Sequence, residues 1–311
     1  MTKDKLPAIK YGTTPNILLL GNGINRAFEQ SSWDALLRDI TTVELSEEEK
    51  VQIGKMPYPL RPVVLTNDQI GEKLQEIAGN LVKTNVLERQ RELLCDYTSL
   101  EFDAILTTNY SYEIEKAIDP EFYCKVKSNS KYRNTTKKGS KTEEQLGLFK
   151  YMKVSKDDKE YRVWHIHGEA ARPASIVLGH YYYGKLLSKV QQYVPTVMAR
   201  YEGSNRYKKD FQPNSWIDYF LIGNVHIVGF GLDFSEMDIW WLINCKKRNA
   251  KKNGKIYFYE PNLNKKDKLA KKLLADVYEV ECVTKELNGK QYIQYYESLL
   301  DDIKDAMEHD L

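Results

Sequence analysis

The chain has 311 residues, 42% of them hydrophobic, and a formal net charge of +2 at pH 7. This length suits one large α/β domain or two modest ones, and the apolar content is enough for a packed core, which excludes global disorder. A nearly neutral chain offers no overall charge that would favour nucleic acid or a membrane surface. No apolar run approaches the roughly 20 residues that a bilayer span requires.

The N-terminal residues do not favour secretion, and the cysteine spacing does not favour a zinc site. Residues 1–6 contain no apolar signal core, and the cysteines lie far apart without a C-x-x-C pair. Such cysteine usage argues against a zinc ribbon and fits a reducing cytoplasm. We therefore expect a cytoplasmic protein without a metal site. The cysteines are Cys95, Cys124, Cys245 and Cys282.

The chain begins with a strand over residues 16–20, which is apolar after its first residue, as expected for a strand covered on both faces. A helix is expected from about Ile24. Ser31 and Ser32 favour a cap for a second helix that starts at Trp33.

Residues from about 44 to 100 predict a mainly helical insertion. Three prolines within residues 56–62 interrupt it and predict an extended crossing segment. Thr66, Asn67 and Asp68 are expected to cap the next helix, which runs towards Leu81.

The middle of the chain predicts a strand at 102–106, a helix at about 111–118 and a basic loop at 125–142. Two segments that flank Lys156–Lys159 have the pattern of a hairpin, so a loop plus hairpin is expected over about 125–165.

The last part alternates strands with helices, which predicts a doubly wound parallel sheet. The expected strands are 176–179, 225–229, 255–260 and 277–283. One helix is expected to begin near residue 235, and two more are expected at about 264–275 and 291–308. We predict a single α/β domain over residues 1–311.

Three predicted strands stop abruptly at small or polar residues. They end at Gly21-Asn22-Gly23, at Thr107-Thr108-Asn109-Tyr110 and at His165-Ile166-His167-Gly168. Ligands of open parallel sheets bind outside the carboxyl ends of the strands. A glycine turn, an amide and an imidazole at that edge predict a pocket for a polar, phosphate-bearing ligand.

Each motif also has a simpler interpretation. Gly21-Asn22-Gly23 lets backbone amides approach a pyrophosphate, or is only a tight strand-to-helix turn, since Arg26 replaces the third glycine of G-x-G-x-x-G. Asn109 can orient water or a ribose hydroxyl, or cap the following helix.

The two histidines, His165 and His167, are spaced to lie on one side of an extended strand. No nearby cysteine completes a metal-ligand set, so zinc is disfavoured. A histidine here can act as a general base or be a hydrogen-bonded buried residue.

A second glycine-bearing turn, residues 229–238, leads into a helix. Asp233 or Ser235 can bind ribose hydroxyls there, or can cap the helix.

Together these motifs resemble the sirtuin-like NAD-consuming domains of bacterial antiphage defence proteins, over roughly residues 16–260. The resemblance implies a Rossmann-like fold with a helical insertion and NAD as substrate rather than cofactor. It also implies Asn109 and His167 as the catalytic pair, and protection of cells by NAD depletion. The implied NAD-binding residues are Gly21, Asn22, Gly23, Thr107, Thr108, Tyr110, Gly229, Gly231, Asp233 and Ser235.

Two departures from the family bear on the activity. The four-cysteine zinc module of the deacylase branch is absent, and the first turn is Gly-Asn-Gly instead of Gly-Ala-Gly. We therefore expect an NAD glycohydrolase. The alternatives are a zinc-free deacylase or ADP-ribosyl transferase, or a nucleotide-sensing module without activity.

The resemblance also implies control by other chains. Regulation by self-assembly into a homo-oligomer, or by a partner such as a ring-forming ATPase, is expected, with the loop at 125–142 as the candidate gate. No membrane association is expected.

Overall fold

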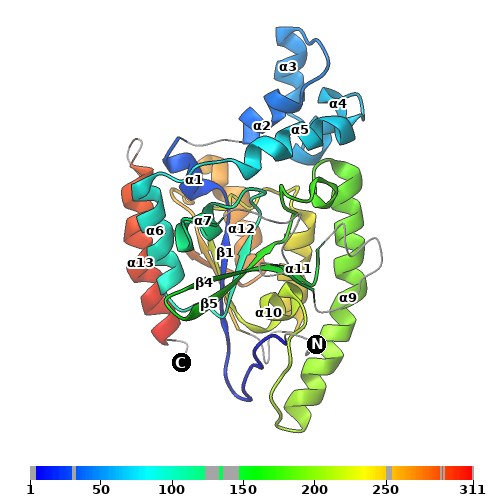
Figure 1. Ribbon diagram of the computed structural model, residues 1–311. Helices are drawn as coiled ribbons and strands as arrows, with labels where there is room; N and C mark the ends of the chain where they lie inside the picture. Colours follow the sequence, from blue (N-terminus) through cyan, green and yellow to red (C-terminus); the bar gives the residue numbers. More distant parts are fainter. Residues whose placement is uncertain are drawn as a thin grey trace.

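An eight-stranded sheet with the order β3-β4-β5-β2-β1-β6-β7-β8 forms the centre of the molecule (Figure 1). The computed structural model describes residues 5–29, 33–122, 133–135, 147–249, 254–287, 289 and 291–309. The strands are β1 (Asn16–Leu20), β2 (Ala104–Thr107), β3 (Arg133–Thr135), β4 (Lys150–Lys156), β5 (Lys159–His165), β6 (Asn224–Val228), β7 (Ile256–Tyr259) and β8 (Glu281–Val283). From β5 to β8 all neighbours pair in parallel, and β4 and β3 extend one edge antiparallel.

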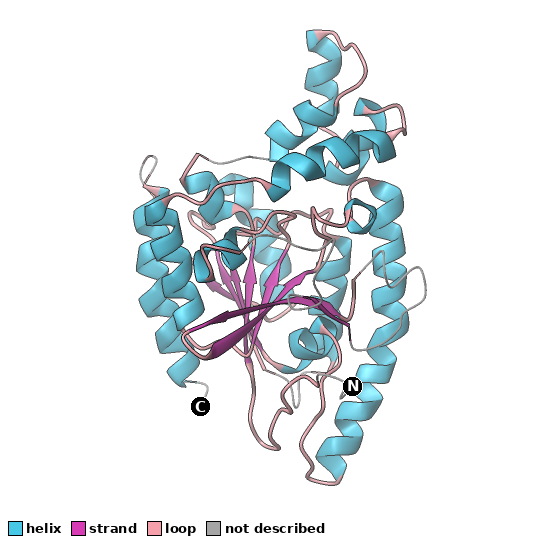
Figure 2. Cartoon of the chain, in the orientation of Figure 1, coloured by secondary structure: helices cyan, strands magenta, loops and turns pink. Residues whose placement is uncertain are grey.

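Helices cover both faces of this sheet (Figure 2). They are α1 (Gly23–Ala27), α2 (Trp33–Ile40), α3 (Glu47–Ile53), η1 (Tyr58–Leu60), α4 (Arg61–Leu65), α5 (Ile70–Val82), α6 (Glu88–Ser99), α7 (Glu113–Ile118), η3 (Pro173–Ser175), α9 (His180–Arg206), α10 (Trp216–Ile222), α11 (Met237–Arg248), η5 (Lys266–Lys268), α12 (Leu269–Val277) and α13 (Tyr292–His309).

The buried residues of β1 alternate between two hydrophobic clusters, one on each face of the sheet. Ile17 and Leu19 pack with residues of α9, α10, α11 and α12, whereas Leu18 and Leu20 pack with residues of α1, α6, α7 and α13. A strand buried on both sides must be apolar throughout, as residues 17–20 are. The predicted Rossmann-like, doubly wound α/β fold is confirmed.

Strand β1 lies between β2 and β6. The strands that follow β1 in the chain are added first on the β2 side of the sheet, and the later strands, from β6 on, are added on the other side of β1. Such a reversal opens a crevice at the carboxyl ends of the strands. In Figure 1, α2, α3, α4 and α5 project beyond this same edge. Helix α6 packs instead on the sheet, with residues such as Leu93 and Tyr97 in its core.

The proline-rich segment is not extended, contrary to the prediction. Pro59 lies inside η1, and Pro62 lies in the first turn of α4. A proline at the start of a helix loses no intrahelical hydrogen bond, so prolines can begin a helix here although they could not continue one. The predicted cap of the next helix is also wrong, because α5 follows Gln69 without a side-chain cap.

The predicted hairpin is confirmed, since β4 and β5 pair antiparallel around Asp157 and Asp158. The predicted strand at 176–179 is wrong. Ile176, Val177 and Leu178 are buried, but they join η3 to α9 outside the sheet. The predicted cap at Ser31 and Ser32, and most of the loop at 125–142, lie outside the described residues.

Candidate functional site

A cavity of about 700 Å³ lies beyond the carboxyl ends of the central strands. Residues of the loops after β1, β2, β5 and β6 form its floor, and residues of α2, η1 and α5 form the opposite wall. The floor includes Asn22, Gly23, Thr108, Asn109, Tyr110, His167, Gly229, Gly231, Asp233 and Glu236, and the opposite wall includes Trp33, Asp39, Tyr58, Ile77 and Asn80. The volume is within the range of pockets that hold small-molecule ligands.

The turn after β1 is joined to the turn after β6 by backbone hydrogen bonds. The Gly21 amide donates to the Val228 carbonyl at 2.9 Å, and the Gly23 amide donates to the Gly229 carbonyl at 2.7 Å. A Cβ atom at Gly21 would lie 2.5 Å from the Gly229 carbonyl oxygen and from the Phe230 Cα. Both atoms belong to the backbone, so the two turns approach this closely only because position 21 is glycine.

Replacing Gly21 with alanine should therefore destabilise the protein by about 1–3 kcal/mol, the usual cost of overpacking. Gly231→Ala is the matched control, because a Cβ there meets no atom within 4 Å. The free energy of unfolding measured by urea titration tests this expectation. Equal stability of the two variants would show that the contact between the turns is not tight.

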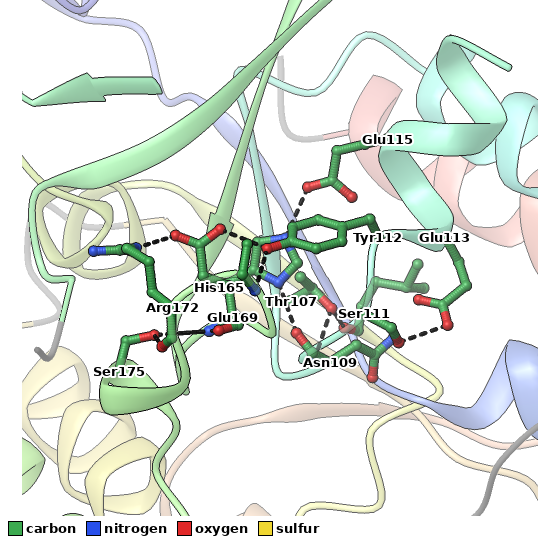
Figure 3. Close-up of polar contacts among 12 residues, drawn as sticks. Thr107, Asn109, Ser111, Tyr112, Glu113, Glu115, His165, Glu169, Arg172 and Ser175 are labelled. Atoms are coloured by element: carbon green, nitrogen blue, oxygen red, sulfur yellow. Dashed lines mark hydrogen bonds and ion pairs between the residues drawn. The ribbon is translucent and has the colours of Figure 1, made fainter. Parts of the chain in front are cut away.

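Asn109 lines the cavity, and hydrogen bonds hold its backbone in place (Figure 3). Its amide N–H donates to Thr107 Oγ1 at 3.1 Å, and the Thr107 hydroxyl donates to the Leu20 carbonyl at 2.8 Å. The side-chain Nδ2 makes only a long contact of 3.4 Å to the Gly21 carbonyl. Asn109 does not cap α7, which follows Tyr112 without a side-chain cap.

His165 holds the Asn109 backbone from the other side. Its Nδ1 lies 2.7 Å from the Asn109 carbonyl oxygen, and its Nε2 lies 2.7 Å from Glu115 Oε1. Burial by itself lowers the pKa of His165, but the Glu115 carboxylate outweighs it and raises the pKa to about 9. At neutral pH both ring nitrogens therefore carry protons and donate to these two oxygens.

His167 belongs to a different cluster. Its Nε2 lies 3.0 Å from Asp238 Oδ2 and 3.9 Å from Glu236 Oε2. Burial alone lowers the pKa of His167, but the carboxylates of Asp238 and Glu236 raise it overall. The expectation that both histidines lie on one side of an extended strand is wrong, because β5 ends at His165 and His167 follows in a turn.

The cluster of His167, Glu236 and Asp238 combines two carboxyl groups with one imidazole. Within the described part of the chain, no lysine or arginine forms an ion pair with either carboxylate. Glu236 Oε2 and Asp238 Oδ1 are buried without a hydrogen-bond partner. One ligand atom from each residue lies within 4.8 Å of the others, so the group has donors and spacing that a divalent cation could use.

Most of the predicted site residues line the same cavity, but three do not. Gly21 and Thr107 lie behind it, where they support the turns. Ser235 does not line the cavity either, because its amide and hydroxyl donate to Asp233 Oδ1 in a turn that precedes α11. Asp233 lines the cavity and makes this turn as well.

Several cavity residues were not predicted as site residues. Glu236, which lines the cavity, and Asp238, which does not, have the ordinary sequence signal of acids at the start of a helix, where they suit the helix dipole. Tyr183 lies in the Tyr181–Tyr183 run at the start of α9, and Tyr58 lies beside the prolines of η1. Only the fold brings these residues next to His167 and Asn109.

A sequence model of the SIR2-like domain matches residues 103–277, more than half of the chain. The chain therefore belongs to the SIR2-like domain family. The matched region contains Asn109, His167 and the turn after β6, and begins after the first glycine turn. SIR2-like domains are typically NAD-dependent enzymes, and the family implies NAD binding.

No curated protein matches this chain. Among the described residues, no helix has the length and the apolar character needed to cross a membrane.

Proposed function

We propose that the protein is an NAD glycohydrolase that cleaves NAD to nicotinamide and ADP-ribose. The observation that carries the proposal is that Asn109 and His167, from separate loops, line one cavity together with two glycine turns. The glycine turns present backbone near the start of α1, where a pyrophosphate is favoured. Asn109 then positions water or the nicotinamide ribose, and His167 acts on a ribose hydroxyl.

A zinc-free deacylase or ADP-ribosyl transferase is the less favoured alternative. The three described cysteines, Cys95, Cys245 and Cys282, lie in α6, α11 and β8, and all three are free. Nothing in this arrangement supports the four-cysteine module that the deacylase branch uses. Product analysis separates these alternatives, and a nucleotide-sensing module without activity, from NAD hydrolysis.

The test is incubation of the purified protein with NAD and identification of the products by chromatography and mass spectrometry. We expect equal amounts of nicotinamide and ADP-ribose. A modified peptide in place of free ADP-ribose would indicate transfer or deacylation. Unchanged bound NAD would indicate a sensor.

We also propose a cellular role, as an antiphage effector of the cytoplasm that depletes NAD. An unrestrained NADase would drain its own host, so activity should depend on self-assembly or on a partner such as a ring-forming ATPase. Phage challenge of cells that express the chain, with NAD measured over time, tests this role. Survival without NAD loss would contradict it.

A further inference from the structure

The cluster of His167, Glu236 and Asp238 contains two carboxylates, and they differ in position. Asp238 is fully buried in the first turn of α11 and does not line the cavity. Glu236, the residue before α11, lines the cavity, and 14% of its side chain is exposed. Glu236 Oε2 is a buried acceptor without a hydrogen-bond partner, and the side chain lines the cavity, so this carboxylate has acceptor capacity left for a molecule bound there.

The proposed reaction needs one proton acceptor and no acid. When the bond between nicotinamide and the ribose C1′ breaks, its electron pair stays on the positively charged ring nitrogen, and nicotinamide leaves neutral. Water then forms the new C1′–O bond and must lose one proton. A single base close to the sugar is therefore sufficient, as for the water-activating carboxylate of inverting glycosidases.

We propose that Glu236 is that base, and that Asp238 is a positioning residue for His167. This inference rests on the proposed NAD cleavage. The Glu236 carboxylate takes the proton of the attacking water and releases it to solvent after ADP-ribose has formed. Asp238 holds His167 through the contact of 3.0 Å between Oδ2 and Nε2, which fixes the orientation of the imidazole.

The surroundings of Glu236 suit this role. The titratable groups that face Glu236 are His167, Asp238, Asp233, Tyr183 and Tyr110. They come from the loops after β5, β6 and β2 and from helices α9 and α11. Burial raises the pKa of Glu236 to about 7, against the opposing effect of His167. A base with such a pKa is well matched to proton transfer near neutral pH. His167, whose pKa is also raised, is a better hydrogen-bond donor than base.

The experiment compares nicotinamide release from NAD by the parent protein and by Glu236→Gln, which keeps the shape of the side chain. We expect kcat to fall by at least about 100-fold, the usual contribution of a general base, with KM nearly unchanged. The parent should lose activity as pH falls through about 7, because protonated Glu236 cannot accept a proton. The residual activity of Glu236→Gln should not show this fall at low pH. Glu202→Gln, a substitution on the exposed surface of α9, is the control.

Azide separates a missing base from a damaged site. Azide ion attacks C1′ without losing a proton, so Glu236→Gln should form ADP-ribosyl azide and nicotinamide at a rate close to that of the parent with azide. Failure of azide to restore nicotinamide release would overturn the role as base. So would parent-like kinetics in the variant.

The same cluster has the donors for a cation, so metal content is a second decisive measurement. We expect activity to survive EDTA. Binding of Mn²⁺ at one ion per chain, lost in Asp238→Asn together with activity, would overturn the proposal in favour of a metal centre. A parent protein that releases no nicotinamide would overturn both the proposed function and this inference, whereas an active parent with an equally active Glu236→Gln would overturn only the inference.

Discussion

Replacing Asn109 or His167 with alanine should reduce NAD cleavage by about 100-fold or more while the protein remains folded. The Asn109 side chain makes only a contact of 3.4 Å within the protein, so its removal should cost little stability. Loss of this amide leaves water or the ribose without an orienting group in the cavity. The measurement is kcat for nicotinamide release, with the thermal midpoint recorded for each variant.

His167→Ala carries a larger structural cost, because it leaves the buried Asp238 carboxylate without its donor. His167→Gln retains an amide that can donate to Asp238, and so it separates chemistry from folding. Both variants should be inactive. His180→Ala, at an exposed histidine of α9, is the matched control and should keep parent activity. Full activity in either Asn109→Ala or His167→Gln would remove that residue from the mechanism.

The second large effect concerns stability. Glu115→Gln should destabilise the protein by about 3–5 kcal/mol near pH 6, because it removes the partner of a buried, charged imidazole. The pKa of His165 is raised from 6.5 to about 9. The stability that this group contributes is therefore fully present below pH 6.5 and is lost as the pH rises through about 9. A pKa shift of this size corresponds to a loss of about 3 kcal/mol from the free energy of unfolding.

The test is urea unfolding of parent and Glu115→Gln between about pH 6 and pH 9.5, where the gap in stability should narrow as His165 loses its proton. Glu113→Gln is the matched control, since Glu113 is also buried in the first turn of α7 but accepts from Ser111 at 2.6 Å. It should keep the pH dependence of the parent. A gap that stays constant with pH would show that the His165–Glu115 pair does not carry the effect.

Local patterns predicted the elements that border the site. β1 and β6 are largely apolar because both faces of the sheet are covered, and each is followed by glycine because two turns meet there. Such signals are short-range, so they can be read from consecutive residues. A short apolar run is a more ambiguous signal, and the strand predicted from it at 176–179 is wrong. Residues 176–178 are apolar because they are buried in the connection between η3 and α9, and burial alone does not make a strand.

By itself, the sequence determined the doubly wound sheet, its glycine turns, and the presence of Asn109 and His167 at strand ends. Tertiary structure alone decided how the two histidines differ. His165 meets Glu115 across 50 positions and His167 meets Asp238 across 71. A β-strand periodicity cannot reveal such pairs, because they depend on which loops converge when separate strands become neighbours. The same convergence brings Glu236 to the cavity wall.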